Sequence, residues 1–241
     1  MPPSKRPILD ALRVAGLHAY YGKAHILQGV DLIVPQGAVV GLFGRNGAGK
    51  TTLMKALMHL VPWVEGEVLL FGRSLIGLPS DARARGGIAY MSQEMRVFPD
   101  LSVEENVRVA ANAVASPLPL DEIVSMIPEL KGLLDRPAGR LSGGQQQLVA
   151  LSRSLAMNCR LILMDEPTEG LMPRLVQRIG EIIRSLAARS VAVLLVEQNV
   201  KLGLAVCQHI YILEKGRVAA HGVPEALLRD RLLDRHLGLM G

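Results

Sequence analysis

One stretch of the sequence decides the fold, Gly44-Arg45-Asn46-Gly47-Ala48-Gly49-Lys50-Thr51, which matches the phosphate-binding pattern G-x-x-x-x-G-K-[ST]. It follows an apolar run at residues 38–43 and precedes residues 52–60, whose apolar side chains recur with helical spacing. Glycines in such a loop let successive backbone N–H groups turn toward phosphate oxygens, and the N-terminus of the next helix adds partial positive charge. The stretch therefore predicts a site for a nucleoside triphosphate.

A second apolar run, at residues 161–164, ends in the carboxylates Asp165 and Glu166. Strands in a parallel sheet point their C-terminal ends at the ligand crevice, so both carboxylates are expected beside the phosphates. Lys50 is expected to reach the β- and γ-phosphates of ATP, while Thr51 and Asp165 hold Mg²⁺ and Glu166 activates the attacking water as general base. The loop residues predicted to bind nucleotide are Gly44, Arg45, Asn46, Gly47, Ala48, Gly49, Lys50, Thr51 and Thr52.

The pattern along the chain predicts an α/β fold. Apolar runs at residues 38–43, 161–164 and 192–196 alternate with helical patterns at 52–60 and 146–157, as in a parallel sheet covered on both faces. Shorter strand patterns at residues 8–14, 27–34 and 67–72 predict a small antiparallel layer beside that core. The proline-containing stretch at residues 99–140 has no strand pattern and predicts an inserted helical region. The expected fold is thus a P-loop NTPase (RecA-like) core with these two additions.

Composition narrows the function classes. Apolar residues make up 49% of the 241 residues, enough for a buried core, and the net charge of +5 is mild. Aromatic residues make up only 3%, with no basic run interleaved with stacking residues, so no nucleic-acid partner is expected. The two cysteines and six histidines have no metal-ligand spacing, so no transition metal is expected. No apolar run reaches the roughly 18 residues of a membrane span, so a membrane role needs a partner.

The segment Leu141-Ser142-Gly143-Gly144-Gln145 begins another predicted helix. Locally it is a capping box, with Ser142 as N-cap and Gln145 three residues later. Each glycine costs a helix about 1 kcal/mol relative to alanine, so capping alone does not explain Gly143 and Gly144. The two glycines leave the helix N-terminus bare, which allows an anion to approach closely.

This segment, between the two phosphate-site motifs, resembles the LSGGQ signature of ABC ATPases. The resemblance covers nearly the whole chain. It implies that Tyr21 stacks on adenine and that Gln93, in Tyr90-Met91-Ser92-Gln93-Glu94, contacts Mg²⁺ and senses membrane subunits. It also implies a head-to-tail dimer, with itself or a second ATPase subunit, in which ATP on one P-loop is covered by the partner's signature. The signature residues expected to bind that nucleotide are Ser142, Gly143, Gly144 and Gln145.

The same resemblance implies one ABC ATPase domain at residues 8–241. The ATP-binding core is expected at 8–95 and 150–241, the helical subdomain with the signature at 96–149, and a flexible lead-in at 1–7. The protein would sit on the cytoplasmic face of the membrane, with two permease subunits and indirectly a solute-binding protein as partners. Val97 and Phe98 either cover the helical core or form a groove that grips the permease; the sequence leaves both readings open.

Two positions depart from the pattern of many ABC ATPases. Met172 stands where the D-loop aspartate falls, and Gln198 where the switch histidine falls. Glutamine can hydrogen-bond a γ-phosphate oxygen but cannot become cationic, so we expect Gln198 to sense that phosphate by hydrogen bonding alone. Three strings are similar to those of the subfamily that takes up branched-chain amino acids, and of its urea and amide relatives: Pro-Thr-Glu-Gly-Leu at 167–171, Val-Glu-Gln-Asn at 196–199 and His-Leu-Gly at 236–238.

Other functions of an ABC ATPase domain are less consistent with the sequence. DNA-maintenance ATPases of the superfamily insert long heptad-repeat arms, whereas only 92 positions separate Lys50 from Ser142, with no coiled-coil pattern. Ribosome-associated ABC proteins need two ATPase units in one chain, and this chain has one. A role in export, powered by the same kind of ATPase domain, stays an open alternative, because the ATPase subunit does not touch the solute.

Overall fold

The computed structural model describes residues 9–94 and 97–238. Within them the strands are β1 (Asp10–Tyr21), β2 (Ala24–Pro35), β3 (Val39–Phe43), β4 (Trp63–Leu70), β5 (Arg73–Ser74), β6 (Ile88–Met91), β7 (Leu161–Asp165), β8 (Ala192–Val196), β9 (His209–Glu214) and β10 (Arg217–Gly222). The α-helices are α1 (Lys50–Leu57), α2 (Ser80–Arg85), α3 (Val103–Ala111), α4 (Leu120–Met126), α5 (Gly143–Ala156), α6 (Pro173–Ala188), α7 (Val200–Val206), α8 (Pro224–Arg229) and α9 (Leu232–Leu237). Two short 3-10 helices are η1 (Pro128–Leu130) and η2 (Ala138–Arg140).

The larger sheet has the order β10-β9-β3-β8-β7-β6, in which β9 to β6 are parallel and β10 pairs antiparallel with β9. Its central strands are buried along their whole length. Ile162 and Met164 pack on one face, in a core that includes residues of α3, α5 and α6, while Leu161 and Leu163 pack on the other face. Two covered faces explain why these strands read as continuous apolar runs, and they confirm the predicted parallel core.

The second sheet is antiparallel, with the order β2-β1-β4-β5, and confirms the predicted antiparallel layer. The strands expected at residues 8–14 and 27–34 are wrong in length, because β1 and β2 form one long hairpin closing at Tyr21 and Ala24. The pairing slips between Val14 and Leu17, around Gly16 at a φ of 55°. Such a bulge shifts the side-chain alternation, which is the signal that marks a strand in a sequence. The strand expected at 67–72 begins earlier, at Trp63.

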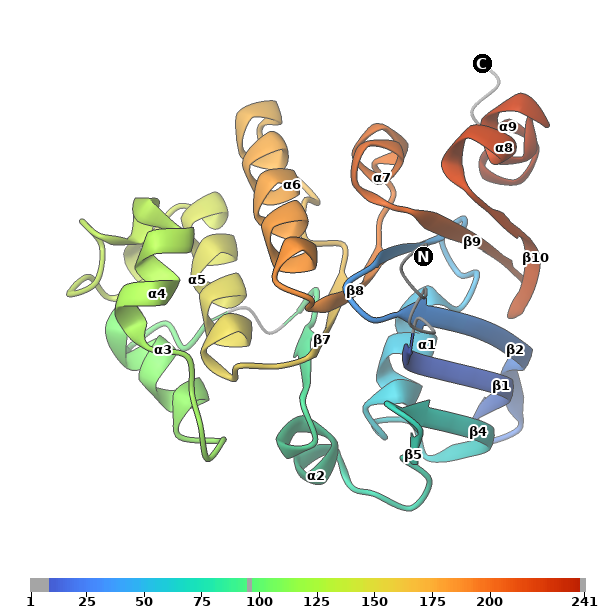
Figure 1. The fold of residues 1–241 in the computed structure, drawn as a ribbon, viewed down its shortest axis with the longest axis horizontal. Helices are drawn as coiled ribbons and strands as arrows, with labels where there is room; N and C mark the ends of the chain where they lie inside the picture. The colour runs from blue at the N-terminus through green and yellow to red at the C-terminus, as the bar shows by residue number, and fades with distance from the viewer. Residues whose placement is uncertain (1–8, 95–96, 239–241) are drawn as a thin grey trace, which may run out of the picture.

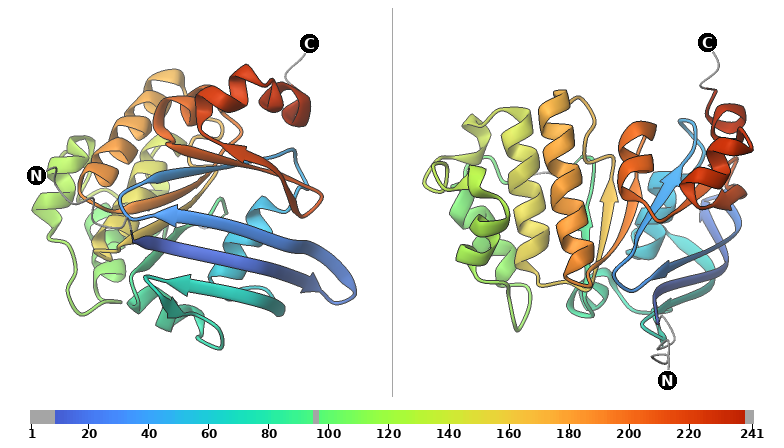
Figure 2. Two further views of the ribbon diagram at one scale, coloured as in Figure 1. Left: turned by 45° about the vertical axis from the view of Figure 1, so that its right-hand side comes forward. Right: turned by 45° about the horizontal axis from the view of Figure 1, so that its top comes forward.

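Figure 1 shows α3, α4 and α5 gathered at one end of the molecule, with α6 between them and the strands. The turned views in Figure 2 keep α5 and α6 side by side and the long β1–β2 hairpin at the opposite end. Helix α1 shares a core with the antiparallel sheet and one face of the parallel sheet, so the two sheets enclose it. Helix α5 spans the boundary expected at 149/150, contacting α3 on one side and β6 on the other. The division into core and helical subdomain stays a prediction.

Two helix ends differ from the expected ranges. The helix expected at residues 52–60 ends at Leu57, because His59 turns at a φ of 56° and the Leu60 N–H donates to the Lys55 carbonyl at 2.8 Å. The helix expected at 146–157 begins earlier, at Gly143, where Ser142 caps it. None of the helices in the described part of the chain has both the length and the apolarity needed to cross a membrane. The lead-in expected at residues 1–7 lies outside the described residues.

Candidate functional site

The loop between β3 and α1 can only be built with glycine at its first position. A Cβ on Gly44 would lie 2.3 Å from the carbonyl oxygen of Leu213, on the neighbouring strand β9. Gly47, at a φ of 78°, has open space where its Cβ would be. Arg45, Asn46 and Gly47 are exposed, whereas Ala48 and Gly49 are buried. The loop therefore packs tightly against the sheet at its base and presents its tip to a ligand.

Lys50 lies beneath this loop, with only 5% of its surface exposed. Its Nζ donates to the carbonyl oxygens of Gly44 at 2.9 Å and Arg45 at 3.4 Å. The same ammonium lies 3.7 Å from Oε1 of Glu166. A desolvated ammonium held by two neutral carbonyls and one carboxylate is poised to bind further anionic oxygens. This placement suits the predicted phosphate contact.

Thr51 and Asp165 lie together, as the predicted Mg²⁺ role requires. The Thr51 hydroxyl donates to Oδ1 of Asp165 at 3.3 Å, and the Tyr90 hydroxyl donates to Oδ2 at 3.3 Å. Burial raises the pKa of Asp165, and burial beside Asp165 also raises the pKa of Tyr90. Carboxylate and hydroxyl oxygens are the ligands that Mg²⁺ prefers, and a cation there would offset the cost of the buried charge. The residues present therefore fit the ion.

Glu166 follows β7 with a φ of 51°, a left-handed conformation that is strained for a side chain other than glycine. Its backbone N–H donates to Val196 at 2.9 Å. Its Oε2 accepts from Nε2 of Gln198 at 2.8 Å and from Nε2 of Gln93 at 3.5 Å. The Gln93 amide also donates to Glu169 at 2.6 Å. The structure thus brings the expected base, the switch glutamine and the Q-loop glutamine into one cluster.

Among the described residues, the side chains of Tyr21 and Thr52 make no hydrogen bond to this cluster. Tyr21 ends β1 with 40% of its surface exposed, and it lies near enough to Tyr90 to contribute to the raised pKa of that hydroxyl. Thr52 is half-buried in the first turn of α1. An exposed aromatic ring at the rim of the site is compatible with the predicted stacking on adenine, which stays a prediction.

The signature segment lies elsewhere. The Gln145 N–H donates to Oγ of Ser142 at 3.3 Å and the Ser142 N–H donates to Oε1 of Gln145 at 3.0 Å, which completes the predicted capping box. Ser142, Gly144 and Gln145 line a cleft of about 690 Å³ together with Met172. The cleft beside the P-loop, about 500 Å³, is lined by Gly44 to Asn46 and Gln198, and shares no residue with it. Within the described residues, the signature and the P-loop therefore line separate clefts.

Sequence reasoning missed Tyr90 and Glu197. Tyr90 lies near the end of β6 and Glu197 directly follows β8, so both stand at carboxyl ends of strands that flank β7. Glu197 is 2% exposed and accepts from Thr168 and from the backbone after it. A carboxylate ending an apolar run was the signal that singled out Asp165, and the same signal was present at Glu197.

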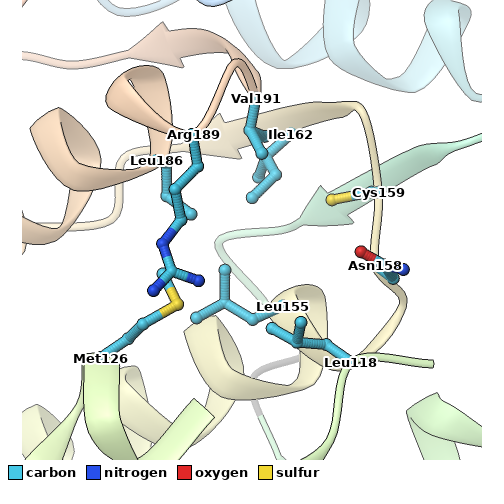
Figure 3. Close-up of a pocket in the computed structure, with 9 residues that line it drawn as sticks. All are labelled: Leu118, Met126, Leu155, Asn158, Cys159, Ile162, Leu186, Arg189 and Val191. Carbon is cyan, nitrogen blue, oxygen red and sulfur yellow. The ribbon is translucent and has the colours of Figure 1, made fainter. Parts of the chain in front are cut away.

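The cavity drawn in Figure 3 lies at the amino ends of the parallel strands, opposite the ends that carry Asp165 and Glu197. It measures about 310 Å³ and lies where β7 and β8 begin, between α4, α5 and the end of α6. Arg189 reaches over apolar side chains that include Leu155 and Ile162, and it pairs with Glu122 at 3.7 Å. None of the predicted site residues lines this cavity.

Comparison with known proteins agrees with this geometry. The sequence profile of the ABC transporter family matches residues 27–169. The chain is 38% identical to the high-affinity branched-chain amino acid transport ATP-binding protein BraG of Pseudomonas aeruginosa, over 91% of this chain and 96% of that protein. It is 36% identical to a probable branched-chain amino acid transport ATP-binding protein, LivF, of Archaeoglobus fulgidus, over 93% and 97%. It is 37% identical to the lipopolysaccharide export ATP-binding protein LptB of Escherichia coli K12, over 90% and 92%.

Among solved structures, the chain resembles a nucleotide-free ATP-binding cassette from an ABC transporter, with a TM-score of 0.84 and 26% identity over 96% of this chain and 98% of that one. The matched profile covers the P-loop, the signature and Asp165. Together with the fold, these matches confirm the resemblance stated from the sequence. The chain belongs to the ABC transporter family and is an ATP-binding ATPase whose hydrolysis of ATP is coupled to transport.

Proposed function

We propose that this ATPase powers the uptake of branched-chain amino acids. The supporting observation is full-length similarity to two relatives named for that transport, at 38% and 36% identity. The strings at residues 167–171, 196–199 and 236–238 favour the same subfamily. The lipopolysaccharide export ATPase LptB, at 37% identity, is the main competitor, and urea or short-amide uptake is the other. The identities are too close to separate these solutes, so a transport measurement decides.

In the proposed catalytic cycle, the N–H groups of the P-loop and Lys50 bind the phosphates of ATP, while Tyr21 stacks on the adenine. Thr51, Asp165 and Gln93 would hold Mg²⁺, which would supply neutralisation of phosphate charge. Glu166 accepts a proton from the water that attacks the γ-phosphorus, the bond from that phosphorus to the bridging β,γ-oxygen breaks, and ADP leaves with that oxygen. Gln198 hydrogen-bonds an oxygen of the transferred phosphate. Support comes from the contacts of Lys50 and Gln198 with the carboxylate of Glu166, at 3.7 and 2.8 Å.

The chain works as a head-to-tail dimer, with itself or with a second ABC ATPase subunit. The cleft lined by Ser142 and the cleft lined by Gly44 are separate in one chain, and Ser142 and Gly143 are exposed. A partner chain that presents its signature to the P-loop would complete the site with a second helix N-terminus. Binding of ATP then joins the subunits, and hydrolysis separates them.

The subunit sits on the cytoplasmic face of the membrane and contacts the permeases through the loop that contains Phe98. The side chain of Asn106, which is fully buried, accepts from the Phe98 N–H at 2.8 Å and donates to its carbonyl at 3.0 Å. The Phe98 ring is 43% exposed, with the Arg153 guanidinium 4.4 Å from its centre. A rigid backbone that presents a half-exposed ring suits a docking site. Met95 and Arg96, in the same loop, lie outside the described residues.

Replacing Phe98 tests this docking site. Phe98→Ala is expected to abolish transport while basal ATPase activity stays within twofold, because the ring lies outside the catalytic cluster. Transport and ATPase assays on the purified complex, reconstituted in vesicles, measure both. Unchanged transport would remove the groove and leave Phe98 as a cover for the helical core.

The substrate proposal is tested in cells that lack the gene for this chain. Uptake of radiolabelled leucine should fall on deletion, recover with the wild-type gene, and stay low with Lys50→Ala, which cannot bind the phosphates. Complexes isolated from membranes should contain two permease subunits, identified by mass spectrometry. Normal leucine uptake in the deletion strain, with lipid-export subunits in the isolated complex, would replace this proposal by the export function.

A further inference from the structure

The buried carboxylate of Glu197 has no part in the proposed catalytic cycle, yet it accepts four hydrogen bonds. Oε1 accepts from the Thr168 N–H at 3.1 Å and from the Thr168 hydroxyl at 2.6 Å. Oε2 accepts from the N–H groups of Gln198 and Asn199, both at 3.1 Å. One side chain thus joins the segment after β7 to the segment after β8.

All four of these donors are neutral, and Glu197 is 2% exposed. Burial raises the pKa of this carboxyl, while the four hydrogen bonds act in the opposite direction. A buried carboxylate without a cation among these donors is costly, and a protein that only needed packing there would be served by an apolar residue. The carboxylate therefore has a use that an apolar residue cannot supply.

The two segments it joins carry the catalytic pair. Glu166 lies two residues before Thr168, and Gln198 directly follows Glu197. Between the same segments, the Glu166 N–H donates to Val196 and the Gln198 side chain donates to Glu166 at 2.8 Å. Glu166 has a strained φ of 51°, a conformation that persists only where neighbouring contacts hold it. The hydrogen bonds of Glu197 provide such contacts on both sides.

We infer that Glu197 is a positioning residue for hydrolysis, which holds Glu166 and Gln198 in register by clamping Thr168 to the backbone after β8. The inference rests on the proposed roles of Glu166 and Gln198. Glu197 also borders the cleft beside the P-loop, but it is 2% exposed and both its oxygens accept from donors of the protein itself, so it acts through the two segments and not on the nucleotide.

Glu197→Gln tests the clamp with little change in size. A glutamine has one oxygen, so its NH₂ group must face either Thr168 or the backbone N–H groups of Gln198 and Asn199. The Thr168 hydroxyl can turn to accept from the NH₂ group, but a backbone N–H cannot, so at least one N–H loses its acceptor in either orientation. We expect kcat to fall about tenfold or more, with the Kd for ATP within about twofold of wild type, because the P-loop is untouched. Turnover is measured on the full chain, alone or in its membrane complex, whichever is active as wild type. Binding is followed with a fluorescent ATP analogue.

Thr168 provides a second route if Glu197→Gln folds poorly. Thr168→Val removes the hydroxyl and keeps the backbone bond, so the same fall in kcat at unchanged affinity is expected on a smaller scale. Thr168→Ser restores the hydroxyl and should restore kcat to near the wild-type value. Asn199→Ala is the matched control, since it removes the side-chain cap of α7 in the same segment and leaves the Asn199 N–H on Glu197. It should lower Tm and keep kcat within twofold.

Hydrogen exchange gives a readout independent of turnover. In Glu197→Gln the amide of Thr168, on the other segment, should exchange faster, whereas in Asn199→Ala it should not. A kcat within twofold of wild type in Glu197→Gln, or equal losses of kcat and ATP affinity, would overturn the inference. The Glu166→Gln variant, measured in parallel, distinguishes a failure of the proposed catalytic role from a failure of the clamp. If that variant keeps full turnover, the proposed catalytic role fails; if it loses turnover while Glu197→Gln keeps it, only the clamp fails.

Discussion

The P-loop and the signature both form glycine-containing N-termini of helices, but the side chains at the two helix ends have different partners. At the P-loop end of α1, Lys50 is 5% exposed and contacts Glu166 on another strand, while Thr51 donates to Asp165. At the signature end of α5, Ser142 is exposed and its capping partner is Gln145, three residues away. The first end is assembled from several strands, and the second from one short segment.

The glycines make the same distinction. A Cβ on Gly44 would meet the backbone carbonyl oxygen of Leu213 at 2.3 Å, so the fold requires glycine there, whereas a Cβ on Gly144 would meet a terminal methyl group of the half-buried Leu175 side chain at 2.3 Å, which would have to move. A Cβ on Gly143 would meet nothing within 4 Å. The fold of this chain does not explain a glycine there, although alanine would favour the helix by about 1 kcal/mol. The open space at Gly143 is what the proposed dimer requires, in which the signature approaches the nucleotide of a partner chain.

The largest expected effect lies on the P-loop side. Glu166→Gln keeps the size of the side chain but removes the proton acceptor, so we expect ATP hydrolysis to fall by about 10²–10⁴-fold, with ATP binding retained. Phosphate release measures the first and equilibrium binding the second. Glu169→Gln is the matched control, since Glu169 is exposed and also contacts Gln93, and it should change turnover less than about threefold. Similar losses in the two variants would remove the special role of Glu166.

An intermediate effect is expected on the signature side. Gly143→Ala should leave the chain as stable as wild type or slightly more stable, and leave ATP binding by the isolated chain unchanged. Hydrolysis should nevertheless fall by about tenfold or more, because a methyl group would obstruct the approach of phosphate held by the partner. Gly132→Ala, which also adds a Cβ with nothing within 4 Å, should leave hydrolysis unchanged. Full activity of Gly143→Ala would break the comparison.

The smallest effect concerns stability without nucleotide or metal. Burial raises the pKa of Asp165 above its ordinary value of 3.8, so ionisation of this carboxyl destabilises the native chain. Asp165→Asn should therefore raise Tm at pH 7 by a few degrees. Because a raised carboxyl pKa means that stability is lost as pH rises through the native pKa, this gain should shrink as pH falls through it. Thermal unfolding of both proteins at several pH values measures the difference in Tm between Asp165→Asn and wild type.

Asp121→Asn, an exposed carboxylate on α4, is the control for this measurement, and its Tm should follow that of wild type. If Asp165→Asn were less stable than wild type at pH 7, the hydrogen bonds from Thr51 and Tyr90 would outweigh the cost of burial. The residues around Asp165 would then stabilise the native chain by themselves, and no unfavourable free energy of a buried charge would remain for a cation to offset.

Much of this protein is determined by short stretches of sequence. The P-loop, the carboxylates after the run at 161–164 and the capped signature each depend on neighbours within about eight positions, where residue type and backbone geometry are directly linked. Burial of the parallel strands on both faces made them continuous apolar runs, so the α/β core could be predicted. The Ser142–Gln145 capping box was predictable for the same local reason.

Tertiary structure alone decided the contacts between segments distant in the chain. Tyr90 meets Asp165 because β6 lies beside β7, and Glu197 meets Thr168 because β8 lies on the other side of β7. The separation of the two clefts likewise depends on where α5 packs. Such contacts depend on strand order and on the path of the loops after each strand. Many distant residues fix these together, so no local pattern encodes them.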